Sequence, residues 1–173
     1  MSNISMTTSK RNAIVTVMLI SAFVSMLNQT ILNTALPAII KGLNITETTA
    51  QWLITGFMLV NGIMIPLTAF LMDKYSTRHL YIFSMAIFLL GSIVAAFSPT
   101  FSILMISRII QAIGAGILLP LMQFTVFTLF PAEQRGFAMG LAGVVVQSAP
   151  AIGPTLTGLF VDLFSWRMPF YLV

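Results

Sequence analysis

The sequence predicts an all-α fold, a polytopic bundle of membrane-spanning helices. Hydrophobic residues make up 58% of the 173 residues and charged residues 7%, well below the roughly 25% charged residues of ordinary soluble domains. Mostly apolar runs recur along the chain, and each is long enough to cross the hydrocarbon core of a membrane as a helix. Because no low-complexity linker or second soluble domain separates these runs, we expect them to form one bundle.

Five spans and the beginning of a sixth are expected. They are residues 13–40, 51–72, 80–97, 101–130 and 137–164, with 166–173 beginning the sixth, so that residues 13–173 form the transmembrane bundle. The first span is too long for the apolar region of a cleavable signal peptide and lacks a small-x-small cleavage site, so it should stay in the membrane. The connections between spans are short, which makes consecutive helices antiparallel neighbours.

The basic residues predict the orientation, because Lys and Arg accumulate in short cytoplasmic loops. One side of the membrane receives Lys10, Arg11, Lys74, Arg78 and Arg135, and the other receives only Lys41 and Arg167. Residues 1–12 are therefore expected to be the cytoplasmic N-terminus of a protein of the cytoplasmic membrane. Topology explains the net charge of +4, and no basic run with interleaved aromatic residues indicates a nucleic-acid partner.

Uncharged polar side chains lie inside several spans, where each is costly unless it has a partner. They are Asn28, Asn33, Asn61, Gln111, Gln123 and Gln147. Such residues indicate an interior cavity or hydrogen bonds between helices. The acidic residues, by contrast, all fall near predicted span ends; they are Glu47, Asp73, Glu133 and Asp162.

Arg108 places a permanent charge inside the span 101–130, and charges at such depth are usually functional. Gln111 follows three residues later and shares its helix face, while Gly114 and Gly116 would let another backbone approach closely. These neighbours predict a packed interior face for the arginine. The alternative is that its side chain snorkels to the membrane interface from a point about 10 Å along the helix from its end.

The span 137–164 carries two prolines, each of which removes a backbone donor. Gly153 beside Pro154 predicts a bend, and Gly158 adds to a face of small residues suited to close helix contact. The alternative is ordinary packing by small residues, which are common in membrane helices.

Two of these segments resemble motifs of the major facilitator superfamily of transporters. Residues 104–116 resemble its fourth-helix RxxQGxG motif, with Ala112 in place of one Gly, and in that family the arginine is implicated in proton coupling. Residues 140–158 resemble its GxxxGPxxGG antiporter motif, with Thr157 replacing one Gly. The resemblance therefore implies a coupling role for Arg108.

The connection at residues 69–79 resembles the GxLaDrxGrk loop of the same superfamily. Asp73, Lys74 and Arg78 match this motif in position and charge type. The resemblance implies that they form a gate loop that latches against the other half of the transporter. The alternative is a solvated turn whose basic residues only fix topology.

Residues 27–37 are similar to the LDxTxVNVALP signature of the second drug:proton antiporter family, whose members have fourteen spans. Together with residues 51–62, 129–136 and 165–170, they point to its lincomycin-resistance branch. The resemblance implies efflux of lipophilic drugs by alternating access. The proton gradient would be the driving force, and no cofactor is expected. The implied substrate cavity would be lined by Asn28, Asn33, Asn61, Gln111 and Gln147.

Asn28 stands where the commoner signature has Asp, and an amide cannot carry a proton. Arg108 therefore cannot form an Arg–Asp pair with this position. Its counter-charge is expected at a helix end or in the C-terminal half of the transporter.

The chain stops as the sixth span begins, so we expect the N-terminal part of a longer transporter, which does not transport by itself. The implied partners are membrane lipid, small lipophilic drugs, protons and the missing C-terminal half. The alternative is a non-transporting membrane interaction module or a truncated inactive product. An enzyme is not expected, because the spans contain no HExxH metal pair, no nucleophile with a nearby base and no phosphate-binding glycine loop.

Overall fold

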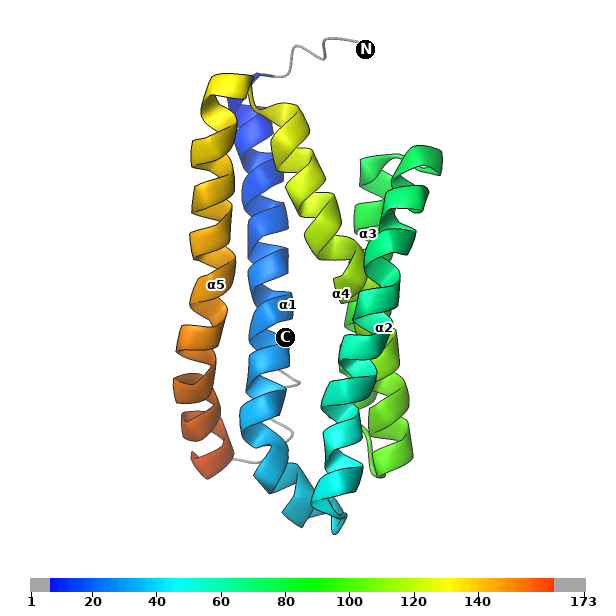
Figure 1. The fold of residues 1–173 in the computed structure, drawn as a ribbon. Coiled ribbons are helices and arrows are strands. Elements are labelled where there is room, and N and C mark those ends of the chain that lie inside the picture. Colours follow the sequence, from blue (N-terminus) through cyan, green and yellow to red (C-terminus); the bar gives the residue numbers. More distant parts are fainter. Residues whose placement is uncertain (1–6, 164–173) are drawn as a thin grey trace.

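The computed structural model describes residues 7–163, with side chains up to residue 158, as a bundle of five antiparallel helices (Figure 1). They are α1 (Thr8–Leu43), α2 (Glu47–Lys74), α3 (Thr77–Ala96), α4 (Phe101–Leu129) and α5 (Ala132–Leu163). Each helix is long and apolar enough to cross a membrane. The predicted all-α class is confirmed, whereas the predicted start of a sixth span at 166–173 lies outside the described residues.

Several helices begin about one turn before the apolar spans that predicted them. At the start of α2 the Thr46 hydroxyl accepts a hydrogen bond from the Thr49 backbone N–H at 3.2 Å. At the start of α3 the Ser76 hydroxyl accepts one from the His79 N–H at 3.5 Å. Such capping turns are polar, so a hydropathy pattern does not include them.

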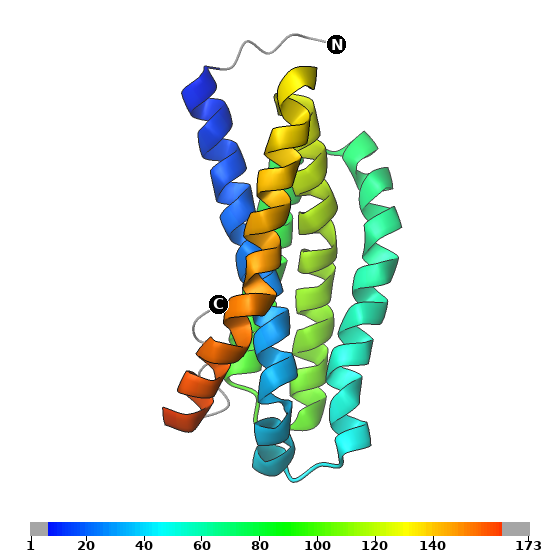
Figure 2. The ribbon, with the colours of Figure 1, turned by 60° about the vertical axis from the view of Figure 1, so that its left-hand side comes forward.

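Helix α4 is central to the bundle, since it packs along α2 and α3 and also contacts α1, which in turn packs along α5 (Figure 2). The α3–α4 contact is close because glycines face it from both helices. A Cβ atom at Gly114 would lie 2.6 Å from the Ser84 carbonyl oxygen, and one at Gly91 would lie 2.6 Å from Gln111 Cγ. The backbones can approach this closely only where side chains are absent.

Large apolar side chains cover much of the outer surface, among them Leu59, Phe83 and Val144. This distribution suits a bundle whose solvent is lipid. Several polar side chains are nevertheless buried inside, and Arg108 is among the largest fully buried side chains. The interior around this arginine is therefore the first place to look for a functional site.

Candidate functional site

Arg108 lies at a junction of helices in the bundle interior, and its side chain is only 1% exposed. Its Nη1 donates a hydrogen bond to Asn28 Oδ1 on α1 and another to Gln111 Oε1 on α4, each at 2.6 Å. The guanidinium thus turns into the bundle and does not snorkel to its surface. Helices α1 and α4 are joined at this point by a charged hydrogen bond.

Of the other two helices of the junction, α2 contacts the guanidinium directly and α3 holds it through Gln111. On α2 the ring of Phe57 lies under the guanidinium, with 4.2 Å from Arg108 Cζ to the ring centroid, which is a cation–π contact. On α3 Ser92 Oγ accepts from Gln111 Nε2 at 2.9 Å and donates to the Phe88 carbonyl at 2.9 Å. Because Ser92 accepts a hydrogen bond from the Gln111 amide nitrogen, the amide oxygen of Gln111 faces Arg108.

No carboxylate neutralises Arg108 within the described part of the chain, where its partners are the amides of Asn28 and Gln111 and the ring of Phe57. Its Nε is buried and has no hydrogen-bond partner there. Amide dipoles orient a guanidinium but leave its charge in place, and a guanidinium does not readily give up its proton. The junction can therefore hold a fixed positive charge but cannot relay a proton by itself.

The five residues predicted to line a cavity fall into two groups. Asn28 and Gln111 are buried against Arg108 and line neither of two cavities found between the described helices. Asn33 is exposed on α1, Asn61 is half-buried on α2, and Gln147 is exposed and lines a cavity between α1, α4 and α5. The prediction did not separate residues that hold the arginine from residues that face open space.

The predicted gate residues lie at the exposed turn between α2 and α3. Asp73 forms no hydrogen bond or ion pair with any residue in the range 7–158, and Lys74 Nζ lies 4.4 Å from the centroid of the Phe70 ring. Arg78 borders a mostly apolar cavity of about 630 Å³ at the same end of the bundle. Charged side chains at this turn are therefore available to form ion pairs or hydrogen bonds with another part of the protein.

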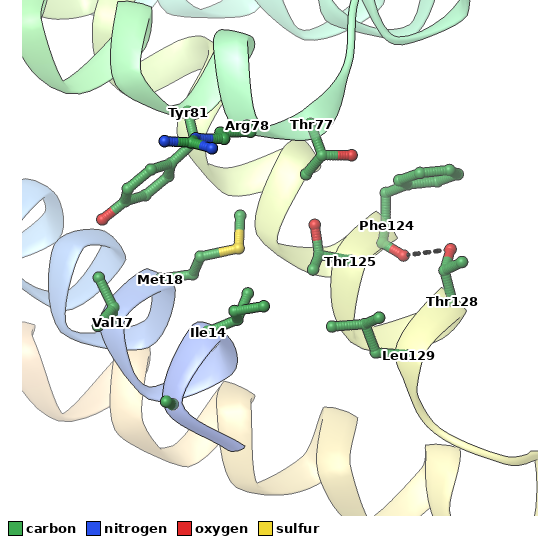
Figure 3. A pocket seen from close by; sticks show the side chains of 11 residues that line it. Ile14, Val17, Met18, Thr77, Arg78, Tyr81, Phe124, Thr125, Thr128 and Leu129 are labelled. Carbon is green, nitrogen blue, oxygen red and sulfur yellow. Dashed lines mark hydrogen bonds between the residues drawn. The ribbon is translucent and has the colours of Figure 1, made fainter. Parts of the chain in front are cut away.

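The cavity beside Arg78 was not predicted from the sequence. Figure 3 shows Arg78 and Tyr81 of α3 on one side of it, with Met18 of α1 and Thr125 of α4 facing them. Tyr81 also shares a 2.6 Å hydrogen bond with Ser21, which ties α3 to α1. Three helices contribute to this lining, and the spacing of residues along one helix gives no signal for it.

The predicted packing residues differ in their surroundings. A Cβ atom at Gly153 would lie 2.7 Å from Thr30 Cγ2, so α5 and α1 are in close contact there, as α3 and α4 are at Gly114. Pro154 is exposed, and the helix continues through it. At Gly158 a Cβ atom would meet no described atom within 4 Å. Of the two motif glycines, Gly153 and Gly158, only Gly153 therefore lies in close contact with a neighbouring helix among the described residues.

Ser92 and Phe57 complete the junction, and sequence reasoning missed both. A serine or a phenylalanine in an apolar span has no pattern of its own, since either can simply pack. Only the position of Arg108 relative to α2 and α3 gives these two side chains a role.

Comparisons with known proteins give the same family as the sequence motifs. The model of the Major Facilitator Superfamily matches residues 18–173. The MFS-type transporter YcnB of Bacillus subtilis is 55% identical over 163 residues, which are 94% of this chain and 34% of YcnB. The lincomycin resistance protein LmrB of the same organism is 44% identical over 155 residues, 90% of this chain and 32% of LmrB.

A more distant relative is the Escherichia coli protein named "Probable multidrug resistance protein EmrY". It is 35% identical over 147 residues, which cover 85% of this chain and 29% of EmrY. The chain spans about a third of the length of these relatives.

Proposed function

The chain belongs to the Major Facilitator Superfamily, and we propose that, within a longer protein, it forms part of an exporter that uses the proton gradient to expel lipophilic drugs by alternating access. The family places the chain among multi-pass membrane transporters. The names of LmrB and EmrY, which refer to lincomycin and multidrug resistance, support drugs as the substrates.

The observation that carries the proposal is the burial of Arg108 among neutral partners. A charge in a poorly polarisable interior attracts an ionised acid strongly and loses that attraction when the acid takes up a proton. We infer that Arg108 couples protons through its fixed field, acting on an acid supplied by another part of the full-length protein. Asn28 and Gln111 would contribute by holding the guanidinium in place.

The remaining predicted residues have proposed roles that follow their positions. Asn33, Asn61 and Gln147 would line the substrate path, because they are exposed or half-exposed on the described bundle. Asp73, Lys74 and Arg78 would latch the α2–α3 turn against the second half of the transporter. Gly114 and Gly153 would set the packing of the described helices that move together, and Pro154 and Gly158 would bend α5 and pack against another part of the full-length protein.

The test uses the full-length protein in inside-out membrane vesicles, with lincomycin as the transported drug. An imposed pH gradient should drive lincomycin uptake by the wild type. Arg108→Ala should lower the gradient-driven rate at least about fivefold. A fivefold factor corresponds to the lower end of the usual range of coupling free energies. Exchange of labelled for unlabelled lincomycin without a gradient should persist, because the substrate path would remain.

Lys41→Ala is the matched control, since Lys41 is an exposed cation in the last turn of α1. It should leave both activities unchanged. Gradient-driven uptake by Arg108→Ala at the wild-type rate would contradict the coupling role. A full-length wild-type protein that moves no drug would contradict the proposed function and favour a non-transporting membrane module.

A further inference from the structure

Two arginines that are far apart in the sequence meet at one phenylalanine, at the end of the bundle where α1 begins. Arg11 lies in the first turn of α1, and its Cζ is 4.4 Å from the centroid of the Phe130 ring. Arg135 lies in the first turn of α5, and its Nε donates a hydrogen bond to the Phe130 carbonyl oxygen at 3.1 Å. Figure 1 shows the start of α1 beside the turn that joins α4 to α5. Two positive charges are therefore held against the same residue.

No acidic side chain neutralises this pair of arginines within residues 7–158. Glu133, which precedes Arg135 in the same helical turn, is exposed and forms no ion pair or hydrogen bond over that range. The Nε of Arg11 is buried and has no hydrogen-bond partner there either. A buried donor without an acceptor is uncommon, and two cations held close together repel each other unless an anion lies between them. The pair therefore offers a site for an anion.

The surroundings of the pair indicate an anion that is attached to an apolar body. The Arg135 guanidinium also lies over the Phe127 ring, with 4.2 Å from Cζ to the ring centroid, and Phe127 is 54% exposed. Phe127 belongs to α4, a helix apolar enough to cross a membrane, whereas Pro131 beside the start of α5 is exposed at a turn. Arginine and aromatic side chains gather where the hydrocarbon of a membrane meets its headgroups. The pair thus lies at the level expected for a lipid phosphate.

We propose that Arg11 and Arg135 jointly bind the phosphate of one anionic phospholipid of the phosphatidylglycerol type, with an acyl chain packed against Phe127. Guanidinium groups match phosphate oxygens through paired N–H donors. A zwitterionic lipid carries the same phosphate together with an ammonium group, which two arginines repel. The cytoplasmic leaflet, which this end of the bundle is expected to face, is anionic. The lipid site involves none of the side chains that hold Arg108 and does not depend on the proposed export function.

The test titrates phosphatidylglycerol into the full-length protein in detergent and measures the bound lipid by native mass spectrometry. Arg11→Gln and Arg135→Gln should each weaken binding at least about tenfold, because each removes a charge-assisted hydrogen bond to the phosphate. The matched control is Lys10→Gln, since Lys10 is exposed beside Arg11 and forms no ring contact or hydrogen bond with a described side chain. Loss of its general attraction to an anionic surface should weaken binding by less than about fivefold.

A double variant distinguishes one shared phosphate from two separate attractions. Once one arginine is lost, the phosphate is no longer held between two cations, so removing the second should cost less than it does in the wild type. Full and independent losses would assign the arginines to separate lipids and overturn the shared site. Arg135→Gln also removes the hydrogen bond to Phe130, so the melting temperature of this variant is measured without lipid. Arg11→Gln breaks no side-chain hydrogen bond of the described chain, and it tests the site even if Arg135→Gln is unstable.

Other results would also overturn the proposal. An equal loss of binding in Lys10→Gln would mean that the lipid is attracted by the charge of the whole end of the bundle. Equal binding of phosphatidylcholine would remove the selection for an anionic lipid. Inorganic phosphate that binds as tightly without lipid, and whose binding is lost in the same variants, would assign the pair to a soluble anion. Failure of drug export by the wild type would contradict the proposed function alone, because lipid binding is measured without transport.

Discussion

At the scale of single residues, Arg108 is oriented by its partners without being neutralised by them. Two amide oxygens accept from Nη1, and the guanidinium lies over the Phe57 ring. A carboxylate at residue 28 would form an ion pair with the guanidinium, but Asn28 supplies only an acceptor. Within the described bundle the positive charge therefore remains available to a group from elsewhere in the protein.

Ser92 should matter for this junction although it does not touch Arg108. Ser92→Ala would leave the Gln111 Nε2 without its acceptor in a buried site. A buried donor left unpaired costs about 1–3 kcal/mol, so we expect the free energy of unfolding in detergent to fall by that amount. The matched control is Ser84→Ala, because Ser84 lies on the same helix, is fully buried and donates only to the Tyr81 carbonyl.

Thermal unfolding of the two serine variants gives the comparison. Ser84→Ala should lose less stability than Ser92→Ala, because it leaves no other side chain unpaired. An equal loss in both variants would mean that Ser92 contributes only local helix packing, and that Gln111 is oriented by other groups.

The sequence could predict part of this junction. A spacing of three residues puts Gln111 on the face of Arg108, and both are buried on that face in the structure. The partner Asn28 is 80 residues away in the chain, and periodicity tells which face a residue occupies but not which helix lies opposite. The family resemblance implies a cavity-lining role for Asn28 and Gln111, and only the structure shows that both are held against the arginine.

At the scale of helices, the glycines of α4 set how closely its neighbours approach. Gly114 faces α3, and Gly116 faces α2, where a Cβ atom would lie 2.5 Å from Met64 Cβ. The sequence predicted a thin helix at these positions because two glycines follow the arginine at helical spacing. It could not predict that α3 supplies a glycine of its own, Gly91, to the same contact.

Gly114→Ala should weaken the α3–α4 contact, because the new methyl group would lie 2.6 Å from a backbone carbonyl oxygen that cannot rotate away. Overpacking of this kind costs about 1–3 kcal/mol, which should appear as a lower melting temperature in detergent. Gly62→Ala on α2 is the control, since a Cβ atom there would meet nothing within 4 Å. That variant should be neutral or slightly more stable, because Ala favours helix over Gly. A neutral Gly114→Ala would mean that α3 and α4 are packed more loosely.

At the scale of the whole molecule, composition and span length were sufficient to predict the fold class. Apolar runs of about 20 residues cross the lipid as helices, and short connections make the helices antiparallel. The central place of α4 and the pairing of α1 with α5 were not predictable in this way. They depend on how helix surfaces fit together, which one sequence does not reveal.

The distribution of charge over the two ends of the bundle predicts its orientation in the membrane. Five basic residues lie at the end where α1 begins, and among the described residues only Lys41 lies at the other (Figure 1). The anionic cytoplasmic leaflet attracts each such cation by about 1 kcal/mol, and translocating them is disfavoured. The α2–α3 and α4–α5 turns should therefore face the cytoplasm.

Single cysteines at exposed positions test this orientation, because the 173 residues contain no cysteine of their own. In intact cells a membrane-impermeant maleimide should label Thr48→Cys, at the end opposite the start of α1. Tyr75→Cys and Gln134→Cys, at the other end, should be labelled only after the membrane is permeabilised. Labelling of Tyr75→Cys from outside would place the basic end in the exterior. The proposed gate loop would then face away from the compartment that supplies the drug, and efflux driven by inward proton flow would require a different latch.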